Sequence, residues 1–279
     1  MLRIAVPNKG TLSETAVEML REAGYATRRD PKELIVADPR NDVEFFYLRP
    51  RDIATYVGSG ALDVGVTGRD LLLDSHSQAV EIDALDFGAS TFRFAGPIGR
   101  FATLHDLQGV RVATSYDGLV RDFLAAEGVD ATVVRLDGAV ESAVRLGVAD
   151  AVADVVETGS TLKKQGLEVF GPVILESSAV LIASRPDVTG LETLRRRIQG
   201  VMVARRYVLV DYDLPADLVD AAVRITPGLE SPTVSPLRDT GWVAVRVMVP
   251  SSETNHVMDE LYALGARAIL VSAIHAARI

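Results

Sequence analysis

Residues 51–68, RDIATYVGSGALDVGVTG, and residues 138–159, GAVESAVRLGVADAVADVVETG, follow the same plan. Each begins with apolar residues at helical spacing, continues through a glycine, and ends in a short apolar strand. When Gly60 is placed on Gly147, Asp63 falls on Asp150. We therefore predict that the chain contains two similar α/β units.

The segments that precede these stretches match as well. Residues 2–6, LRIAV, are typical of a buried strand, and residues 13–24 are typical of a helix that ends at Gly24. Residues 109–128 repeat the order strand, loop, helix. Such alternation predicts parallel sheets that bind ligands beyond the carboxyl ends of their strands, so two facing lobes would form a cleft. The alternative is that any two βα units look this similar without a true repeat.

The last quarter of the chain has a different order of elements. From about residue 206 a strand, a helix, a strand, a helix and a strand follow one another, and residues 231–237, SPTVSPL, can supply one more strand. The order would then be βαββαβ, that of a ferredoxin-like module, which is too small for a second enzyme and more suited to an effector or a sister subunit. We predict three parts: a discontinuous lobe I (1–92 and about 180–205), lobe II (93–179) and a C-terminal domain (206–279).

The composition excludes several functional classes. The 279 residues, 48% of them hydrophobic, suffice for one large or two modest cores. The net charge of −9 and the lack of long basic runs argue against nucleic acid as a partner. Cysteine is absent, and the four histidines lack metal-ligand spacing. Because neither a signal-peptide h-region nor an 18-residue apolar span is present, we expect a cytoplasmic protein with no membrane partner.

Residues 154–162, DVVETGSTL, combine the groups that a phosphorylated sugar needs. Gly159 lets backbone N–H groups approach an anion after a parallel strand, and the hydroxyls of Thr158, Ser160 and Thr161 can donate to phosphate oxygens. Asp154 and Glu157 suit ribose hydroxyls or hydrated Mg²⁺ instead. A ligand with a phosphate, a diol and a Mg²⁺-bound diphosphate is 5-phosphoribosyl 1-pyrophosphate (PRPP). The alternative is a solvated turn, since Thr-Gly-Ser-Thr is also ordinary turn composition.

The wider stretch resembles the signature of the ATP phosphoribosyltransferases, which open histidine biosynthesis. RIAVPNKGTLSE near the N-terminus, FFYLRPRDIATYVGSGALDVGVTGRDLL, and ITPGLESPTVSPL near the C-terminus resemble the family too, so the similarity covers essentially the whole chain. The extra C-terminal module resembles the long form, and the match is strongest with actinobacterial members. The signature positions met are Glu141, Gly147, Ala149, Val152, Asp154, Val155, Thr158, Gly159, Thr161 and Leu162.

The resemblance implies a fold and a set of site residues. It implies two catalytic lobes like those of periplasmic binding proteins, and a Mg²⁺-dependent enzyme that joins ATP and PRPP to N1-(5-phosphoribosyl)-ATP and pyrophosphate. The Mg²⁺ would be held mainly by the substrate. Thr11 departs from the arginine that many members have after Lys-Gly, so one phosphate contact is in doubt. The implied residues are Asp154, Glu157, Thr158, Gly159, Ser160 and Thr161 for PRPP; Lys9, Arg49 and Arg51 for the phosphates; and Asp70, Leu71 and Tyr116 for the adenine nucleotide.

The same resemblance implies regulation by the C-terminal domain. The long form binds histidine there as a feedback inhibitor, and inhibition requires that histidine favour one arrangement of lobes or subunits. We therefore expect a homo-oligomer, from dimer to hexamer. The residues in stretches similar to that site are Asp213, Leu229, Thr233, Ala268 and Ser272.

Two other functions remain open from the sequence. Type I phosphoribosyltransferases, which act on free bases, have a similar acidic, Thr-Gly-containing loop, but their two acids are adjacent, whereas Val155 and Val156 separate Asp154 from Glu157 here. A non-enzymatic two-lobed binding protein is the second alternative, although a helix-turn-helix does not accompany the lobes.

Overall fold

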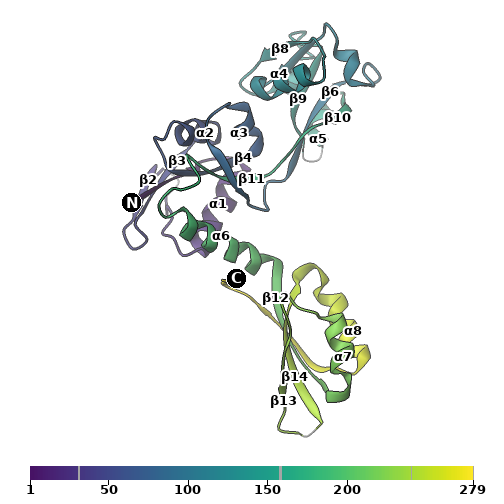
Figure 1. Ribbon diagram of the computed structural model, residues 1–279. Coiled ribbons are helices and arrows are strands. Elements are labelled where there is room, and N and C mark those ends of the chain that lie inside the picture. The colour runs from purple at the N-terminus through teal and green to yellow at the C-terminus, as the bar shows by residue number, and fades with distance from the viewer. Residues whose placement is uncertain (31, 157–158, 240, 279) are drawn as a thin grey trace. The chain divides into compact units, whose positions relative to one another are not determined.

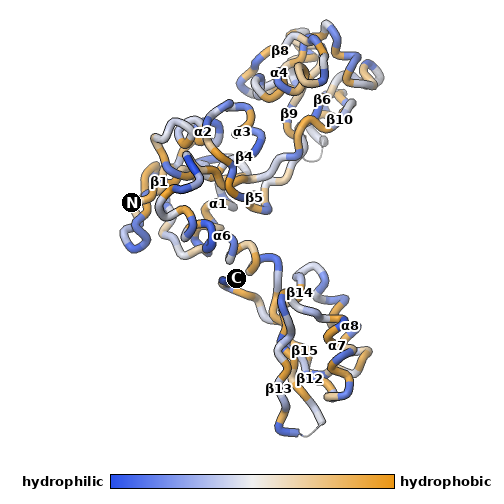
Figure 2. Tube along the Cα trace, viewed as in Figure 1, coloured by the Kyte–Doolittle hydropathy of each residue, from blue (hydrophilic) through white to orange (hydrophobic). Residues whose placement is uncertain are grey.

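The computed structural model describes residues 1–30, 32–156, 159–239 and 241–278. Two compact units make up the chain, residues 1–18 with 25–191 and residues 19–24 with 192–279. Figure 1 shows both units, with most of their helices and strands labelled. Apolar and polar residues are interspersed along the chain in Figure 2, and among the described residues we find no helix with the length and apolar character needed to cross a membrane.

The first sheet of the first unit has the strand order β2-β3-β1-β4-β11-β5. β11 is antiparallel to both β4 and β5, although it follows them by about a hundred residues in the chain. Every residue of this strand, AVLIA, is buried, which explains why it takes an inner position in the sheet. The strands are β1 Leu2–Pro7, β2 Ile35–Asp38, β3 Val43–Leu48, β4 Val64–Gly68, β5 Val80–Ala84 and β11 Ala179–Ala183, and the helices are α1 Thr11–Glu22, α2 Pro50–Gly58 and α3 Arg69–Asp74.

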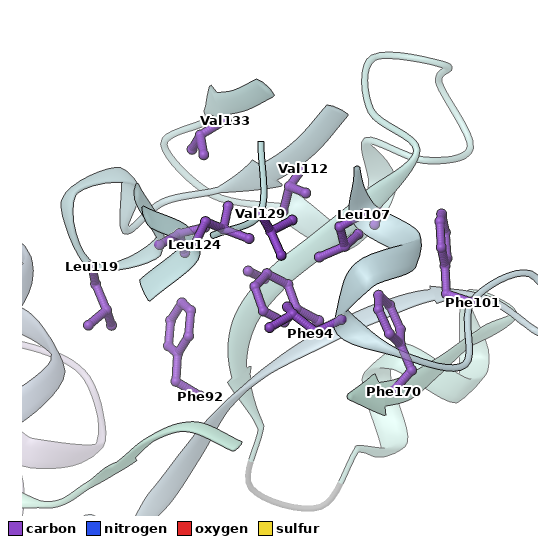
Figure 3. Close-up of a cluster of buried hydrophobic side chains, with 14 residues drawn as sticks. Phe92, Phe94, Phe101, Leu107, Val112, Leu119, Leu124, Val129, Val133 and Phe170 are labelled. Carbon is purple, nitrogen blue, oxygen red and sulfur yellow. The ribbon is translucent and has the colours of Figure 1, made fainter. Parts of the chain in front are cut away.

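The second sheet of this unit has the order β10-β6-β9-β7-β8. Its core is rich in phenylalanine, as Figure 3 shows. The rings of Phe101 and Phe170 are stacked, with their centroids 5.1 Å apart. The elements are β6 Ser90–Pro97, β7 Arg111–Thr114, β8 Thr132–Arg135, β9 Ala151–Val156, β10 Leu167–Ser177, α4 Asp117–Ala126, α5 Ser160–Lys164 and the short 3₁₀ helices η1 Leu104–Leu107 and η2 Val140–Ser142.

The two sheets confirm the predicted repeat. β3-β1-β4-β11 in the first sheet corresponds to β8-β7-β9-β6 in the second, with the fourth strand antiparallel to the third in both. The aligned aspartates are equivalent in detail, because Asp63 forms an ion pair with Arg3 of β1 and Asp150 forms one with Arg111 of β7. In each case the aspartate N–H also donates to the carbonyl of that arginine.

The helix expected at the start of residues 138–159 is wrong. Only Val140–Ser142 form a 3₁₀ turn there, and turns continue to Gly147. Ala139 has a left-handed backbone with φ of 48°, and the side chain of Leu146 is 75% exposed. The apolar residues of this stretch are therefore not gathered into one buried helical face, which is what would have stabilised a helix.

The C-terminal domain has the predicted βαββαβ order. Its sheet runs β13-β14-β12-β15, and one face carries buried residues such as Val210, Tyr212 and Val247, packed with Ala222 of α7 and Leu261 of α8. The elements are α6 Leu191–Arg206, β12 Tyr207–Pro215, η3 Ala216–Leu218, α7 Val219–Ile225, β13 Thr233–Pro236, β14 Trp242–Pro250, η4 Ser251–Glu253, α8 Thr254–Leu264 and β15 Arg267–Ala273.

Candidate active site

The loop predicted to bind a phosphate follows the carboxyl end of β9. Gly159 precedes α5 and has φ of 68°, a left-handed conformation that glycine adopts without strain. Ser160 and Thr161 are exposed in the first turn of α5, while Leu162 is buried beneath them. The other two predicted members, Glu157 and Thr158, lie outside the described residues. The described part of the loop thus presents two hydroxyls to solvent on a turn anchored by an apolar side chain.

Asp154 lies on β9, just before this loop, and its carboxyl group is surrounded by negative charge. Burial raises its pKa above the ordinary value, and the charges of Glu141 and Asp70 raise it further, while a hydrogen bond from the Val155 N–H to Oδ1 at 2.8 Å acts in the opposite direction. Ionisation of Asp154 is therefore costly in this structure as it stands. A cation or a set of hydroxyl donors beside it would relieve that cost.

Asp70 and Leu71 lie in the first turn of α3, beyond the carboxyl end of β4, and both are buried. The Oδ1 atom of Asp70 accepts a hydrogen bond from the Ser177 hydroxyl at 2.9 Å. The charge of Asp70 also acts on the Tyr116 hydroxyl and on Asp154, and it raises the pKa of each. The fold therefore brings Asp70 close to two other predicted site residues, Tyr116 and Asp154.

Tyr116 precedes α4 and completes this group. Its ring meets Phe92 edge-on at 5.0 Å, and the guanidinium of Arg51 lies 4.8 Å from the ring centroid. Burial, followed by the charge and hydrogen bond of Asp70, raises the pKa of the Tyr116 hydroxyl far above its ordinary value. This hydroxyl stays protonated at neutral pH and can act only as a hydrogen-bonding group, not as a base.

The three predicted cations differ in their surroundings. Arg51 donates from Nη1 to Asp74 at 2.6 Å, so its charge is already paired. Lys9 and Arg49 are exposed, and within the described ranges neither forms an ion pair. They follow neighbouring parallel strands, since Pro7 of β1 pairs with Leu48 of β3 and the Asn8 N–H donates to the Leu48 carbonyl at 2.8 Å. The sheet thereby places two free cations at the same edge.

The donor set suits a Mg²⁺ ion that is held chiefly by a substrate. Among the described residues, no group of three or more His, Asp or Glu side chains is arranged to bind a metal. Mg²⁺ commonly keeps several waters and takes one or two carboxylates together with substrate phosphates. Asp154, with its raised pKa and acidic neighbours, is the described carboxylate that fits this role.

A cavity of about 460 Å³ adjoins the end of β9 and was not predicted from the sequence. Thr91 lines it and donates from Oγ1 to the Val156 carbonyl at 3.1 Å, directly before the signature loop. Arg69 brings a positive charge to this cavity, although Glu81 pairs with it at 2.6 Å. The only sequence signal was the hydroxyl-rich composition at the strand ends. The lining residues are Arg69, Ala89, Ser90, Thr91, Val156, Glu176, Ser177 and Ser178.

Arg93 is a second residue that the sequence reasoning missed. It lies opposite Asp154 in the β6–β9 register, and it donates from Nη2 to the Gly171 carbonyl at 3.0 Å. Its Nε is buried and has no hydrogen-bond partner among the residues that the structure describes. The periodicity of the strand, STFRFAGP, indicated only that Arg93 alternates with buried phenylalanines.

The five residues proposed for an effector occupy two places on the C-terminal sheet. Leu229 and Thr233 line a cavity of about 350 Å³ together with Glu230, Arg246 and Arg278, among others. Asp213 lies on β12, and Ala268 and Ser272 lie on β15. Because β13 and β15 are the two edges of this sheet, Thr233 and Ser272 are separated by three strand spacings, roughly 14 Å. Ser272 does not line this cavity, although its register partner Leu209 on β12 does.

Comparison with known proteins gives consistent results. The family model described as "HisG: ATP phosphoribosyltransferase" matches residues 49–200, and that described as "HisG, C-terminal domain" matches residues 204–276. The ATP phosphoribosyltransferase of Pseudarthrobacter chlorophenolicus is 66% identical over 284 residues, and that of Streptomyces avermitilis is 59% identical over 285 residues, each covering 100% of both chains. Both organisms are actinobacteria, in agreement with the resemblance seen in the sequence.

A solved structure with a similar fold supports the same assignment. It is the ATP phosphoribosyl transferase (HisG:HisZ) complex from Thermotoga maritima, with a TM-score of 0.64 and 27% sequence identity. The match covers 72% of this chain and 98% of that chain. The expected fold is therefore confirmed: the first two sheets and this neighbour support the two-lobed α/β core, and the third sheet and the C-terminal family model support the βαββαβ domain.

Proposed function

The chain belongs to the ATP phosphoribosyltransferase family, and on this premise we propose that it joins ATP and PRPP to form N1-(5-phosphoribosyl)-ATP and pyrophosphate. The observation that carries the proposal is the arrangement at the carboxyl ends of the strands. The signature loop at Gly159 follows β9, and Asp70 interacts with Tyr116 and Asp154 close to it. The proposed site thus has a sugar-phosphate side and a nucleotide side.

The sugar-phosphate side consists of the loop and Asp154. We assign the 5-phosphate of PRPP to Gly159, Ser160 and Thr161, with Thr158 as a further donor, and the ribose hydroxyls to Asp154 and Glu157. The left-handed Gly159 supports this assignment, because it lets the backbone approach an anion before α5 begins. Hydroxyls that donate to a carboxylate would also relieve the unfavourable charge around Asp154.

The nucleotide side consists of Asp70, Leu71 and Tyr116. The protonated hydroxyl of Tyr116 and the buried carboxylate of Asp70 form a fixed pair that can orient an adenine ring. N1 of adenine has a free lone pair, so attack on C1 of the ribose needs no strong general base. Orientation of the two substrates then becomes the main contribution of these residues.

The leaving diphosphate requires positive charge. Lys9 and Arg49, which lie beyond neighbouring strands and are unpaired within the described ranges, are suited to stabilise it as charge develops. Arg51 supports the site indirectly through Asp74 and the Tyr116 ring. Bound Mg²⁺ would supply further neutralisation of the diphosphate, with Asp154 as a candidate ligand.

A product assay tests this function directly. Purified protein is mixed with ATP, PRPP and Mg²⁺, and phosphoribosyl-ATP is sought by its absorbance and mass. A type I enzyme would require a free base in place of ATP, and a binding protein would form no product at all. Repeating the assay with a chelator tests the proposed Mg²⁺ requirement, since activity should then be lost and return when Mg²⁺ is restored.

We also propose that histidine inhibits the enzyme through the C-terminal domain and that the chain acts as a homo-oligomer in the cytoplasm. The positions of Thr233 and Ser272 on the two edge strands of the sheet support an effector site shared between subunits, because an edge strand is open to contact with another chain. Sedimentation analysis with and without histidine tests this, and a monomer that is nevertheless inhibited would contradict it.

A further inference from the structure

The hydroxyl of Ser177 holds Asp70 from a distant part of the chain. Ser177 is the last residue of β10 and is buried. Its Oγ donates to Asp70 Oδ1 at 2.9 Å and accepts the Asp70 N–H at 3.1 Å, across a separation of 107 residues. The Arg69 N–H donates to the Ser178 carbonyl at 3.0 Å. Three hydrogen bonds therefore join the start of α3 to the end of β10.

The Asp70 carboxylate also lies close to Gly68. A Cβ atom added to Gly68 would overlap Asp70 Oδ1, so the carboxylate is folded back over the Gly68 backbone. Glycine at position 68 leaves the space that this orientation needs. The carboxylate thus depends on glycine at position 68 for space and on the Ser177 hydroxyl for a hydrogen bond.

Ser177 connects the two halves of the proposed site. β10 pairs with β6 of the second sheet, whereas Asp70 belongs to the helix that follows β4 of the first sheet. Ser177 also lines the 460 Å³ cavity beside Val156, where the signature loop begins. A group at this position can fix the nucleotide side of the site relative to the strand that leads to the sugar side.

We propose that Ser177 is a positioning residue that sets the affinity for the adenine nucleotide by holding the Asp70 carboxylate in place. This inference rests on the proposed function, in which Asp70 contacts that nucleotide. Without the hydroxyl, Asp70 loses the hydrogen bond that fixes its orientation, and it also faces the negative charge of Asp154. The carboxylate then turns away from the position in which it and Tyr116 meet the ligand together.

Steady-state kinetics of Ser177→Ala provide the test. We expect the KM for ATP to rise roughly 10- to 100-fold, the range associated with a hydrogen bond to a charged group, while the KM for PRPP changes by less than about threefold. Ser177→Thr, which retains the hydroxyl, should restore most of the affinity. Ser75→Ala is the matched control, because Ser75 donates to the Leu72 carbonyl at the other end of α3, and it should leave both KM values unchanged.

A double-mutant cycle separates positioning from a merely structural role. If Ser177 acts through Asp70, Ser177→Ala adds nothing to the ATP defect of Asp70→Ala, whereas independent effects would multiply. Multiplying effects, an equal rise in both KM values, or wild-type kinetics of Ser177→Ala would each overturn the inference. If the wild-type protein forms no phosphoribosyl-ATP, the proposed function fails instead. Calorimetric titration of Ser177→Ala with ATP alone still tests the inference in that case, and unchanged affinity refutes it.

Discussion

Arg51 donates from Nη1 to Asp74 Oδ2 at 2.6 Å, and Asp74 Oδ1 accepts the Leu119 N–H of α4 at 3.2 Å. One carboxylate thus joins α2, α3 and α4. The sequence suggested that Arg51, like Lys9 and Arg49, faces the substrate phosphates. The structure instead gives Arg51 a partner whose side chain is only 7% exposed, so its main contribution is expected to be structural.

Replacing Arg51 with alanine should lower the free energy of unfolding by about 1–2 kcal/mol, because a largely buried carboxylate loses its cation while the arginine side is partly screened by solvent. Urea denaturation followed by circular dichroism measures this. Arg49→Ala is the control, since Arg49 is exposed, and its denaturation midpoint should equal that of the wild type. Equal shifts in both variants would show that the pair with Asp74 is not the cause.

Neutralising Lys9 or Arg49 should lower kcat by roughly 100-fold with little change in the KM for ATP, as for the loss of a donor that stabilises developing charge. The variants Lys9→Gln and Arg49→Gln would be compared under saturating substrates. Lys32→Gln makes the same change of charge at an exposed position outside the site and should keep the wild-type kcat. Wild-type turnover of Lys9→Gln and Arg49→Gln would refute their proposed role.

Gly159→Ala should raise the KM for PRPP by about tenfold, because a left-handed residue with a side chain costs about 1–2 kcal/mol and the loop would relax to avoid this strain. Among the described residues the nearest atom to the added methyl group belongs to the Val156 side chain, at 3.7 Å, so strain rather than a clash is tested. Gly166→Ala imposes similar strain just after α5, where φ is 72° and the space is open. That control should lose similar stability and retain its KM for PRPP.

Asp154→Asn should make the free protein more stable at neutral pH and less active. The pKa of Asp154 is raised above its unfolded value, mainly by burial, so the folded state is favoured when the group is protonated and disfavoured when it is ionised. This favourable contribution is complete below the unfolded pKa of 3.8 and is lost as the pH rises through the folded pKa. The stability gain of Asp154→Asn over the wild type should therefore be largest at pH 7 and vanish below pH 3.8. A gain that grows on acidification would contradict the direction of the shift.

Thr233→Val should weaken histidine inhibition by about tenfold while leaving kcat without histidine unchanged, because the cavity beside Leu229 and Arg246 loses a hydroxyl partner. Inhibition curves at fixed substrate concentrations measure the effect. Ser235 lies two residues further along β13 and does not line that cavity. The control variant Ser235→Ala should therefore be inhibited by histidine as strongly as the wild type. Identical inhibition curves for Thr233→Val and wild type would remove Thr233 from the proposed effector site.

The repeated plan of the two α/β units, the C-terminal βαββαβ order and the glycine-containing loop after β9 could all be predicted from the order of residues. These features follow from short-range periodicity and turn composition, because adjacent residues largely decide whether a strand, a helix or a left-handed turn forms. The equivalence of Asp63 and Asp150 could be predicted for the same reason, because both lie at the same spacing after a glycine. Each forms an ion pair with an arginine of the corresponding strand.

How distant segments meet could not be predicted from the order of residues and became visible in the folded protein. The insertion of β11 between β4 and β5, the pairing of Arg51 with Asp74, and the hold of Ser177 on Asp70 all depend on which buried surfaces and hydrogen-bonding groups find each other across the fold. Residues 138–147 illustrate the same limit. Their apolar residues have helical spacing, but only a 3₁₀ turn forms, because Leu146 is exposed and does not pack in a core. Local periodicity sets the elements, but long-range burial selects their partners and hence the chemistry of the site.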